Sequence, residues 1–227
     1  MYRILDKKIL VLALAWLVIG LVMLSQLAHQ VASFELRLSA IPGLAWMILS
    51  GILLNPVWRF VWRKVPRLGR WFPDLNGFWD VEVKSNWSRQ VQLLDAAIDA
   101  KNCIDMRHVS ADQLAELSNI NLLAEITQTW WGLEMTLTNP GEASPLRRSD
   151  TIVIEPISGK GHRPPGICYF YKQSSVSDNV FDDPEFYGAA QLTYDRESDI
   201  LEGFFSTSRM WRRAMNTAGT VTFTRCK

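Results

Sequence analysis

The chain has 227 residues, 48% of them hydrophobic, and a formal net charge of +1. This length favours one globular domain plus a membrane anchor over two full domains. Residues 1–72 hold 9 Lys/Arg against 2 Asp/Glu, whereas residues 73–227 hold 15 against 21. A net charge of −6 on the larger part (15 − 21) argues against binding of polymeric nucleic acid, which needs a surplus of cations.

The three cysteines, Cys103, Cys168 and Cys226, lie far apart in the sequence and form no C-x-x-C pair. An odd and sparse set of cysteines is typical of a reducing compartment. We therefore expect neither a disulfide scaffold nor a zinc site.

Two uncharged, apolar stretches occupy the first quarter of the chain. Twenty residues without a charge lie between Lys8 and His29, and twenty-one lie between Arg37 and Arg59. About 20 apolar residues are needed to cross a hydrocarbon core of roughly 30 Å. The pattern predicts two transmembrane helices over about 9–28 and 38–58, with a pair of buried core helices as the alternative.

Basic residues flank both predicted spans: Arg3, Lys7 and Lys8 precede the first, and Arg59, Arg63, Lys64, Arg67 and Arg70 follow the second. The positive-inside rule then places both termini in the cytoplasm and the short connecting loop outside. Asn55-Pro56 near the end of the second stretch favours a helix start or a kink, because proline lacks an N–H and fixes φ. Residues 1–72 are thus predicted to form an anchor that ends in a basic linker.

Residues 73–227 are predicted to form a cytosolic β-rich domain. The run 75–84 alternates apolar and polar residues, as a half-buried strand does. Residues 88–118 contain helical spacing and Ser110-x-x-Gln113, which resembles a capping box, so we expect a short helical insertion. Further strand-like runs, separated by turn residues, cover 124–138, 149–157, 167–173, 186–194, 199–208 and 219–225.

Seven or eight strands without βαβ alternation predict an antiparallel barrel or sandwich. Closure into a barrel removes exposed edges, and eight strands leave room for packed side chains or one small ligand. We expect a membrane-anchored, antiparallel eight-stranded β-barrel.

The sequence carries no recognisable catalytic pattern. His29, His108 and His162 do not cluster, and no G-x-S-x-G, H-E-x-x-H or D-x-D-x-D-G pattern is present. The acidic run 178–186 suits either a cation site or a solvated loop. We expect no enzyme activity, no catalytic residues, no cofactor and no bound metal.

Ligand recognition is the remaining possibility, because aromatic residues adjoin cations or hydroxyls at several strand ends. Aromatic faces stack nucleobases, and arginine binds phosphate. On this chemistry the expected ligand-binding residues are Trp79, Trp131, Tyr171, Lys172, Thr207, Arg209 and Arg212. The alternative for each of them is a place in the core or in a solvated hairpin loop.

Taken together, the two N-terminal spans, the basic linker, the opening L-x-G-x-W (Leu75, Gly77, Trp79) and the closing LEGFFSTSR and GTVTFTR are similar to the CD-NTase-associated protein 15 family. These are two-transmembrane, β-strand-rich effectors of CBASS antiphage systems. The resemblance covers nearly the whole chain. Residues 88–118 and the pair Trp130-Trp131 depart from it.

The resemblance implies a specific function at the bacterial inner membrane. An eight-stranded barrel would bind a cyclic dinucleotide made by a partner nucleotidyltransferase, the CD-NTase, upon phage infection. Binding would promote homo-oligomerisation, disrupt the inner membrane and end growth before phage matures. The residues alone leave two alternatives open: a membrane-anchored barrel that binds a lipid or fatty acid, and a structural membrane subunit.

Overall fold

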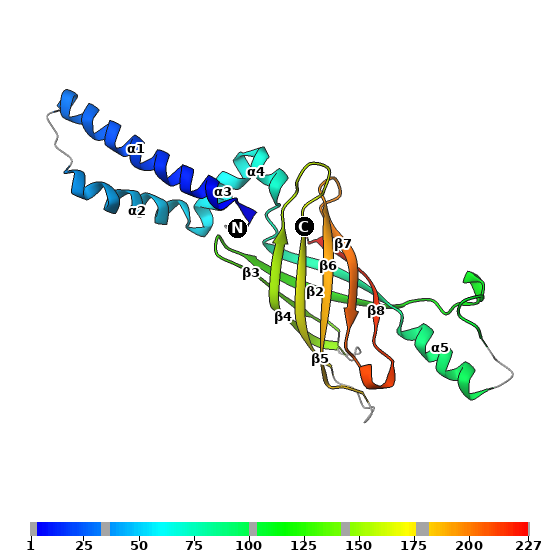
Figure 1. Ribbon diagram of the computed structural model, residues 1–227. Helices are drawn as coiled ribbons and strands as arrows, with labels where there is room; N and C mark the ends of the chain where they lie inside the picture. The colour runs from blue at the N-terminus through cyan, green and yellow to red at the C-terminus, as the bar shows by residue number, and fades with distance from the viewer. Residues whose placement is uncertain (1–3, 33–36, 100–103, 142–145, 176–181, 227) are drawn as a thin grey trace. The chain divides into compact units, whose positions relative to one another are not determined.

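The computed structural model of the protein describes residues 4–32, 37–99, 104–141, 146–175 and 182–226. The chain forms two compact units. The first comprises Met1–Asp74 together with the turn Thr129–Gly132, and the second comprises Leu75–Gln128 and Leu133–Lys227 (Figure 1).

The first unit begins with helix α1 (Lys7–Ala32), which agrees with the predicted first span. Its stretch Lys7–Leu27 is long and apolar enough to cross a membrane. At 1.5 Å per residue, 21 residues reach about 31 Å, which matches the hydrocarbon thickness of a bilayer. Large apolar side chains such as Leu12, Trp16 and Met23 are exposed on its surface, as lipid contact would require.

The predicted second span, 38–58, is not one straight helix. A 3₁₀ turn (Leu38–Ala40) leads into α2 (Ile41–Ile52), and α3 (Asn55–Lys64) follows at an angle of 73°. Pro56 accounts for the break, because it offers no N–H to the carbonyl of Ile52 and its ring would collide with that carbonyl in a continuous helix. The expected kink is therefore present. Helix α2 by itself is only about 18 Å long, which is shorter than a hydrocarbon core of roughly 30 Å.

Helix α3 carries two buried tryptophans, and the short helix α4 (Pro66–Trp71) follows it. Trp58 and Trp62, four residues apart on one face of α3, contact edge to face with ring centroids 5.9 Å apart. The Nε1 of Trp62 donates to the carbonyl of Phe72 over 2.8 Å. These contacts fix the direction in which the chain leaves α3.

Asp74 pairs with two of the basic residues that follow the second apolar stretch. Its carboxylate accepts from Arg59 at 3.1 Å and from Arg63 at 3.2 Å. The side chain of Asp74 is only 13% exposed, so both arginines are held beside the end of the first unit. The basic linker is therefore a folded element rather than an extended tether.

The second unit is a closed barrel of eight antiparallel strands, in which each strand pairs with the next and β1 also pairs with β8. The strands are β1 (Gly77–Ser85), β2 (Ser118–Gln128), β3 (Leu133–Thr138), β4 (Leu146–Ile157), β5 (Gly166–Ser175), β6 (Glu185–Asp195), β7 (Ile200–Thr207) and β8 (Ala218–Arg225). The predicted eight-stranded barrel is confirmed. Closure leaves no unpaired strand edge.

The predicted helical insertion differs in extent from the observed one. In the residues that the structure describes it contains α5 (Trp87–Ile98) and a 3₁₀ turn (Ala111–Gln113), and Ser110 makes no side-chain capping bond. Its last residue, Ser118, already belongs to β2. The predicted run 124–138 is the second part of β2, a turn at Thr129–Gly132, and β3. Strand β2 therefore begins at Ser118, earlier than the start of the predicted run at residue 124.

One end of the barrel is filled by its core. Trp79, Ile167, Leu201 and Phe223 are fully buried there. The backbone N–H of Leu75 donates to Oε1 of the buried Gln128 over 2.6 Å. Asn76 bonds the backbone of Gln128 in both directions (2.8 and 3.0 Å), and Arg225 donates to the carbonyl of Asn76. These bonds tie the segment before β1 to the ends of β2 and β8 at this end of the barrel.

Candidate ligand-binding site

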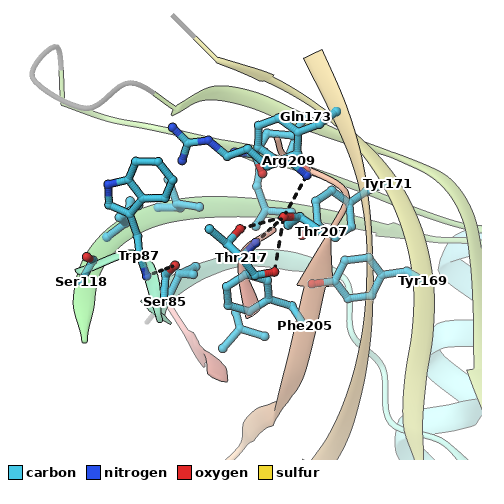
Figure 2. Close-up of a pocket in the computed structure, with 17 residues that line it drawn as sticks. Ser85, Trp87, Ser118, Tyr169, Tyr171, Gln173, Phe205, Thr207, Arg209 and Thr217 are labelled. Carbon is cyan, nitrogen blue, oxygen red and sulfur yellow. Dashed lines mark hydrogen bonds between the residues drawn. The ribbon is translucent and has the colours of Figure 1, made fainter. Parts of the chain in front are cut away.

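The barrel contains a cavity of about 150 Å³ in the half opposite the filled end, and it is partly open to solvent (Figure 2). It lies where β1, β5 and β7 end and where β2, β6 and β8 begin. Aromatic side chains make up much of its wall: Trp87, Tyr169, Tyr171, Phe186 and Phe205. Alternation along the strands places the last four of these inside, because every second residue points into the barrel, whereas Trp87 is the first residue of α5 (Trp87–Ile98).

Gly188 makes room for one of the tyrosines. It faces the interior on β6, directly opposite Tyr171 on β5. A Cβ atom at position 188 would lie 2.4 Å from Cζ of Tyr171, which is closer than any allowed contact. Glycine at this position therefore lets the Tyr171 ring lie across the neighbouring strand. Tyr169 follows it at a centroid distance of 5.6 Å.

The hydroxyls of Tyr169 and Tyr171 are hydrogen-bond donors directed into the cavity. In Figure 2 both rings project from β5 into the space bounded by Phe205 and Thr217. Neither hydroxyl has a hydrogen-bond partner among the described residues, and neither is sealed off from the cavity. A polar group in apolar surroundings is costly to leave unpaired, so these two hydroxyls define where a ligand would supply acceptors.

Burial keeps both phenols protonated. It raises the pKa of Tyr171 above its ordinary value of 10. Burial also raises the pKa of Tyr169 well above that value, and the neighbouring Tyr171 raises it further. Both groups therefore act as neutral donors throughout the physiological range.

This shift predicts a loss of stability at alkaline pH. The folded-state pKa of each tyrosine exceeds the unfolded-state value, so the stabilisation is complete below about pH 10 and declines above it, because only the unfolded chain then ionises. Each phenol contributes a slope of about 1.4 kcal/mol per pH unit at most. Urea titrations from pH 9 to 11.5 measure it. In Tyr169→Phe/Tyr171→Phe the decline should be shallower, and an unchanged decline would contradict the assignment.

A hydroxyl network joins the end of β7 to the residue before β8 at the cavity wall. The hydroxyls of Thr207 and Thr217 share a hydrogen bond of 2.7 Å, and both side chains are buried. The Thr207 hydroxyl also accepts from the backbone N–H groups of Thr217 (3.2 Å) and Arg209 (3.3 Å). Thr207 is thus held mainly by the protein, and it fixes the start of the β7–β8 connection.

Arg209 is held in place by an acid and by two aromatic rings. Its Nε donates to Oδ1 of Asp182 over 3.0 Å, and its Nη2 donates to Oδ2, giving a two-point ion pair. The Asp182 side chain is 3% exposed and that of Arg209 is 17% exposed. The guanidinium carbon lies 4.4 Å from the Trp87 ring centre and 5.8 Å from that of Phe186. Arg209 therefore builds the cavity rim with its charge already neutralised.

The acidic run consequently has a structural role in its described part. Asp183 follows Asp182 and accepts from the backbone N–H of Met210 over 2.7 Å. Residues 178–181 of the run lie outside the described residues. Among the residues that the structure describes, no group of three or more His, Cys, Asp or Glu could hold a metal ion.

Three of the seven expected ligand-binding residues line the cavity: Tyr171, Thr207 and Arg209. The other four lie elsewhere. Trp79 is a fully buried core residue whose Nε1 donates to the carbonyl of Leu75 over 3.0 Å. Lys172 points away from the interior and pairs with Glu185 at 2.7 Å. Because β5 alternates, Lys172 and Tyr171 cannot both face the cavity.

The two remaining residues are exposed. Trp131 lies in the turn Thr129–Gly132 and is 65% exposed. Arg212 belongs to the 3₁₀ turn Trp211–Arg213 between β7 and β8, with its guanidinium carbon 5.5 Å from the Trp211 ring centre. Neither lines the cavity. Arg212 belongs to the same connection as Arg209 and Thr217, which both do.

The seven expected residues omit several that line the cavity, among them Trp87, Tyr169, Gln173, Phe205 and Thr217. Two-residue steps from Tyr171 along its strand would have found Tyr169 and Gln173. The same step from Thr207 would have found Phe205. The place of Thr217 in the cavity wall depends on how β7 pairs with β8, which the sequence pattern does not give. Trp87 lies between the predicted strand 75–84 and the predicted insertion 88–118, so it belonged to neither.

No known protein-family model matches the sequence, and no curated protein resembles it significantly.

Proposed function

We propose that the chain is a membrane-anchored receptor whose cytosolic barrel binds a cyclic dinucleotide, and that binding promotes self-association and disruption of a bacterial inner membrane as part of CBASS antiphage defence. One observation carries the receptor part. A ring-sized cavity in the barrel presents two protonated tyrosine hydroxyls that have no partner among the described residues. The resemblance to the CD-NTase-associated protein 15 family supplies the identity of the ligand.

The size of the cavity limits what enters it. An apolar cavity of about 150 Å³ holds a group the size of benzene. One nucleobase therefore occupies the cavity, with its polar edge against Tyr169 and Tyr171 and its faces against the aromatic wall. Stacking of a base on an aromatic side chain contributes about 1–3 kcal/mol. The second base and the phosphates lie outside, at the opening.

Cations at the opening suit the phosphates. Arg209 stands at the rim, but its charge is balanced by Asp182. Arg212 and Arg213 follow in the same β7–β8 connection and both are exposed. Charge-assisted contacts to phosphate are about twice as strong as neutral hydrogen bonds. These two arginines supply the positive charge that the cavity wall lacks.

The membrane anchor crosses the bilayer twice in this proposal, with α1 as one span and the bent pair α2–α3 as the other, and both termini face the cytoplasm. The flanking basic residues support this orientation. Protease added to intact spheroplasts should leave the barrel uncut and should digest it only after lysis. Digestion before lysis would place the barrel outside, away from a cytosolic ligand.

Ligand acts by favouring the self-associated state. It shifts that equilibrium only by the difference between its affinities for the two states, and each factor of ten corresponds to about 1.4 kcal/mol. One stacked base with two phenol hydrogen bonds and one phosphate contact provides several kcal/mol in total. If half of this binding free energy is gained only in the assembled state, the ligand binds that state about a hundredfold more tightly than the unassembled one.

Isothermal titration of the full chain in detergent against a panel of cyclic dinucleotides tests the ligand. At least one member should bind, and Gly188→Ala should abolish binding, because its Cβ would displace the Tyr171 ring. Ala189→Gly, a change on the outward face of the same strand, is the matched control and should bind normally. If no cyclic dinucleotide in the panel binds the protein, the receptor function is refuted.

A second candidate is a barrel that binds a lipid or fatty acid. The predominantly apolar wall and the neutralised Arg209 favour it. Mass spectrometry of molecules extracted from the purified protein separates the two candidates. The double change Arg212→Ala/Arg213→Ala separates a dinucleotide from an uncharged lipid, since it should weaken a dinucleotide about tenfold or more and leave an uncharged apolar ligand unaffected.

A further inference from the structure

Helix α3 carries an exposed apolar stripe directly after the second apolar stretch. Val57, Phe60 and Val61 lie on one face of the helix, at spacings of three and four residues. Their exposed fractions are 38%, 62% and 39%. Trp58 and Trp62 are buried on another side of α3, so the stripe is not the face by which the helix packs on its own unit.

Basic side chains border this stripe. Lys64 lies one turn after Phe60 on the same face, and its Nζ is 5.8 Å from the centre of the Phe60 ring. A lysine in this place lays its apolar stem along the stripe and extends its ammonium group beyond it. Arg63 is 65% exposed even though it also pairs with Asp74. Residues 54–73 contain five Lys/Arg and no Asp or Glu.

Helix α2 differs from α3 in the way its apolar residues are distributed. It contains no charged residue, and large side chains such as Trp46 and Met47 are exposed at 74% and 67%. A helix that is apolar all round suits the hydrocarbon core, whereas an apolar stripe beside basic residues is typical of a helix at the surface of an anionic bilayer. The apolar surface of α2 therefore continues into the stripe of α3, while the basic charge begins only with α3.

The second span does not need α3 in order to cross. Residues 38–54 comprise 17 residues (54 − 38 + 1) and reach about 26 Å, at the lower end of the length that spans a bilayer. A helix α3 that continued the crossing would carry its three basic residues into the hydrocarbon, which is costly.

The bend between α2 and α3 allows α3 to lie parallel to the membrane surface. The two helices differ in direction by 73°, so α3 lies in the plane of the membrane when α2 is tilted by 17° from the bilayer normal (90° − 73°). Transmembrane helices are tilted by about 20° on average. The observed angle therefore matches an ordinary tilted span that is followed by a helix on the surface.

We infer that α3 is an interfacial helix that binds anionic lipids of the cytoplasmic leaflet. The stripe Val57/Phe60/Val61 inserts toward the acyl chains, and Lys64 and Arg63 contact lipid phosphates. Charge complementarity identifies this partner, because the cytoplasmic leaflet is anionic and attracts basic segments beside a span. The inference rests on the membrane anchoring proposed above and refines it: residues 38–54 make the crossing, and α3 turns away from it.

Depth-dependent fluorescence quenching in liposomes without nucleotide tests the position of α3. The full chain carries Cys103→Ser, Cys168→Ser and Cys226→Ser and one new cysteine, labelled with an environment-sensitive dye. Val57→Cys and Val61→Cys report on the stripe, Ile19→Cys on α1, and Phe204→Cys on the surface of β7, where Phe204 is 74% exposed. The liposomes contain equal parts of phosphatidylcholine and phosphatidylglycerol, with spin-labelled quenchers placed near the headgroups or near the bilayer centre.

Both stripe labels should lie at one depth and should be quenched most by the shallow quencher. In a helix that continues the crossing, their depths would differ by about 6 Å, which is four residues at 1.5 Å each. The Ile19 label should be quenched most by the deep quencher, and the Phe204 label only by aqueous iodide. Stripe labels at unequal depths, stripe labels reached by iodide like Phe204, or stripe labels reached by neither kind of quencher would overturn the inference.

The lipid charge is tested in the Val57→Cys chain. Shallow quenching of its label should be stronger in the mixed liposomes than in phosphatidylcholine alone, and Lys64→Glu should remove that difference. Lys84→Glu is the matched control, since Lys84 lies on β1 with its side chain 48% exposed, and it should preserve the difference. A label that does not respond to phosphatidylglycerol, or a response that survives Lys64→Glu, would contradict binding of anionic lipid through this helix.

The same liposomes separate this inference from the proposed function. An Ile19 label reached by iodide would refute the membrane anchoring itself, and the inference with it. A deep Ile19 label together with stripe labels in water would refute the interfacial helix alone and leave the anchored receptor standing. Nucleotide binding does not enter the measurement, so a receptor without a cyclic dinucleotide ligand would still show the expected depths.

Discussion

Trp79→Ala is expected to lower the free energy of unfolding of the barrel by about 4 kcal/mol, the range found when a buried aromatic side chain is removed from a core. Trp79 is fully buried, its Nε1 donates to the carbonyl of Leu75, and its ring lies 4.2 Å from the guanidinium carbon of Arg225. The change removes the ring, the hydrogen bond and the support of Arg225 together. Urea denaturation followed by circular dichroism measures the effect.

Trp131→Ala is the matched control, since Trp131 is 65% exposed, and it should change the free energy of unfolding by less than about 1 kcal/mol. Trp79→Phe keeps most of the buried surface and should retain ligand affinity. If Trp79→Phe were stable but lost ligand binding, Trp79 would have to be regarded as a ligand residue after all.

The residues of the opening L-x-G-x-W explain why the fold could be predicted and part of the site could not. Gly77 has a φ of +123°, a conformation open chiefly to glycine. It turns the chain so that Leu75 fills the barrel end and Trp79 bonds its carbonyl. The motif therefore specifies the entry into the barrel. Its tryptophan was a reasonable ligand candidate by chemistry alone, but its place at the filled end depends on tertiary packing.

Alternation predicted the strands well and could have predicted more of the cavity. The pattern of β5 and β6 gives which residues face inward, yet it does not say which inward residues fill the core and which line a space. Gly188 makes that difference at one point, because its missing side chain leaves room for the Tyr171 ring. The ion pair of Arg209 with Asp182 could not be predicted, since the two residues are 27 positions apart and meet only through the folded β5–β6 and β7–β8 connections.

The anchor shows the same division between local and tertiary information. Pro56 predicts a kink from covalent geometry alone, and the chain bends there. The size of the bend and the pairing of Arg59 and Arg63 with Asp74 depend on contacts among α3, α4 and the residues after them. A hydropathy window treats 38–58 as one uniform segment, so it predicts neither the size of the bend nor the pairing of the arginines with Asp74.

Tyr169→Phe/Tyr171→Phe is expected to weaken binding of the cyclic dinucleotide that binds the parent chain most tightly by about 5–150-fold, from two lost hydrogen bonds of about 0.5–1.5 kcal/mol each. The double substitution should lower the affinity for the ligand without lowering the stability of the fold. Neither hydroxyl has a partner among the described residues, so its removal leaves no buried group unsatisfied and should leave the melting temperature equal or higher. Isothermal titration and thermal denaturation measure the two quantities.

Tyr194→Phe provides the control, because the Tyr194 hydroxyl donates to Asp199 over 2.8 Å and does not line the cavity. It should leave affinity unchanged. A double variant that binds as tightly as the parent would show that the phenols do not contact the ligand, and the base would then have no polar anchor inside the barrel. Equal weakening by Tyr194→Phe would instead show that the barrel as a whole, rather than its cavity, had been disturbed. Only the combination of weak binding in the double variant and normal binding in the control assigns recognition to the two hydroxyls on β5.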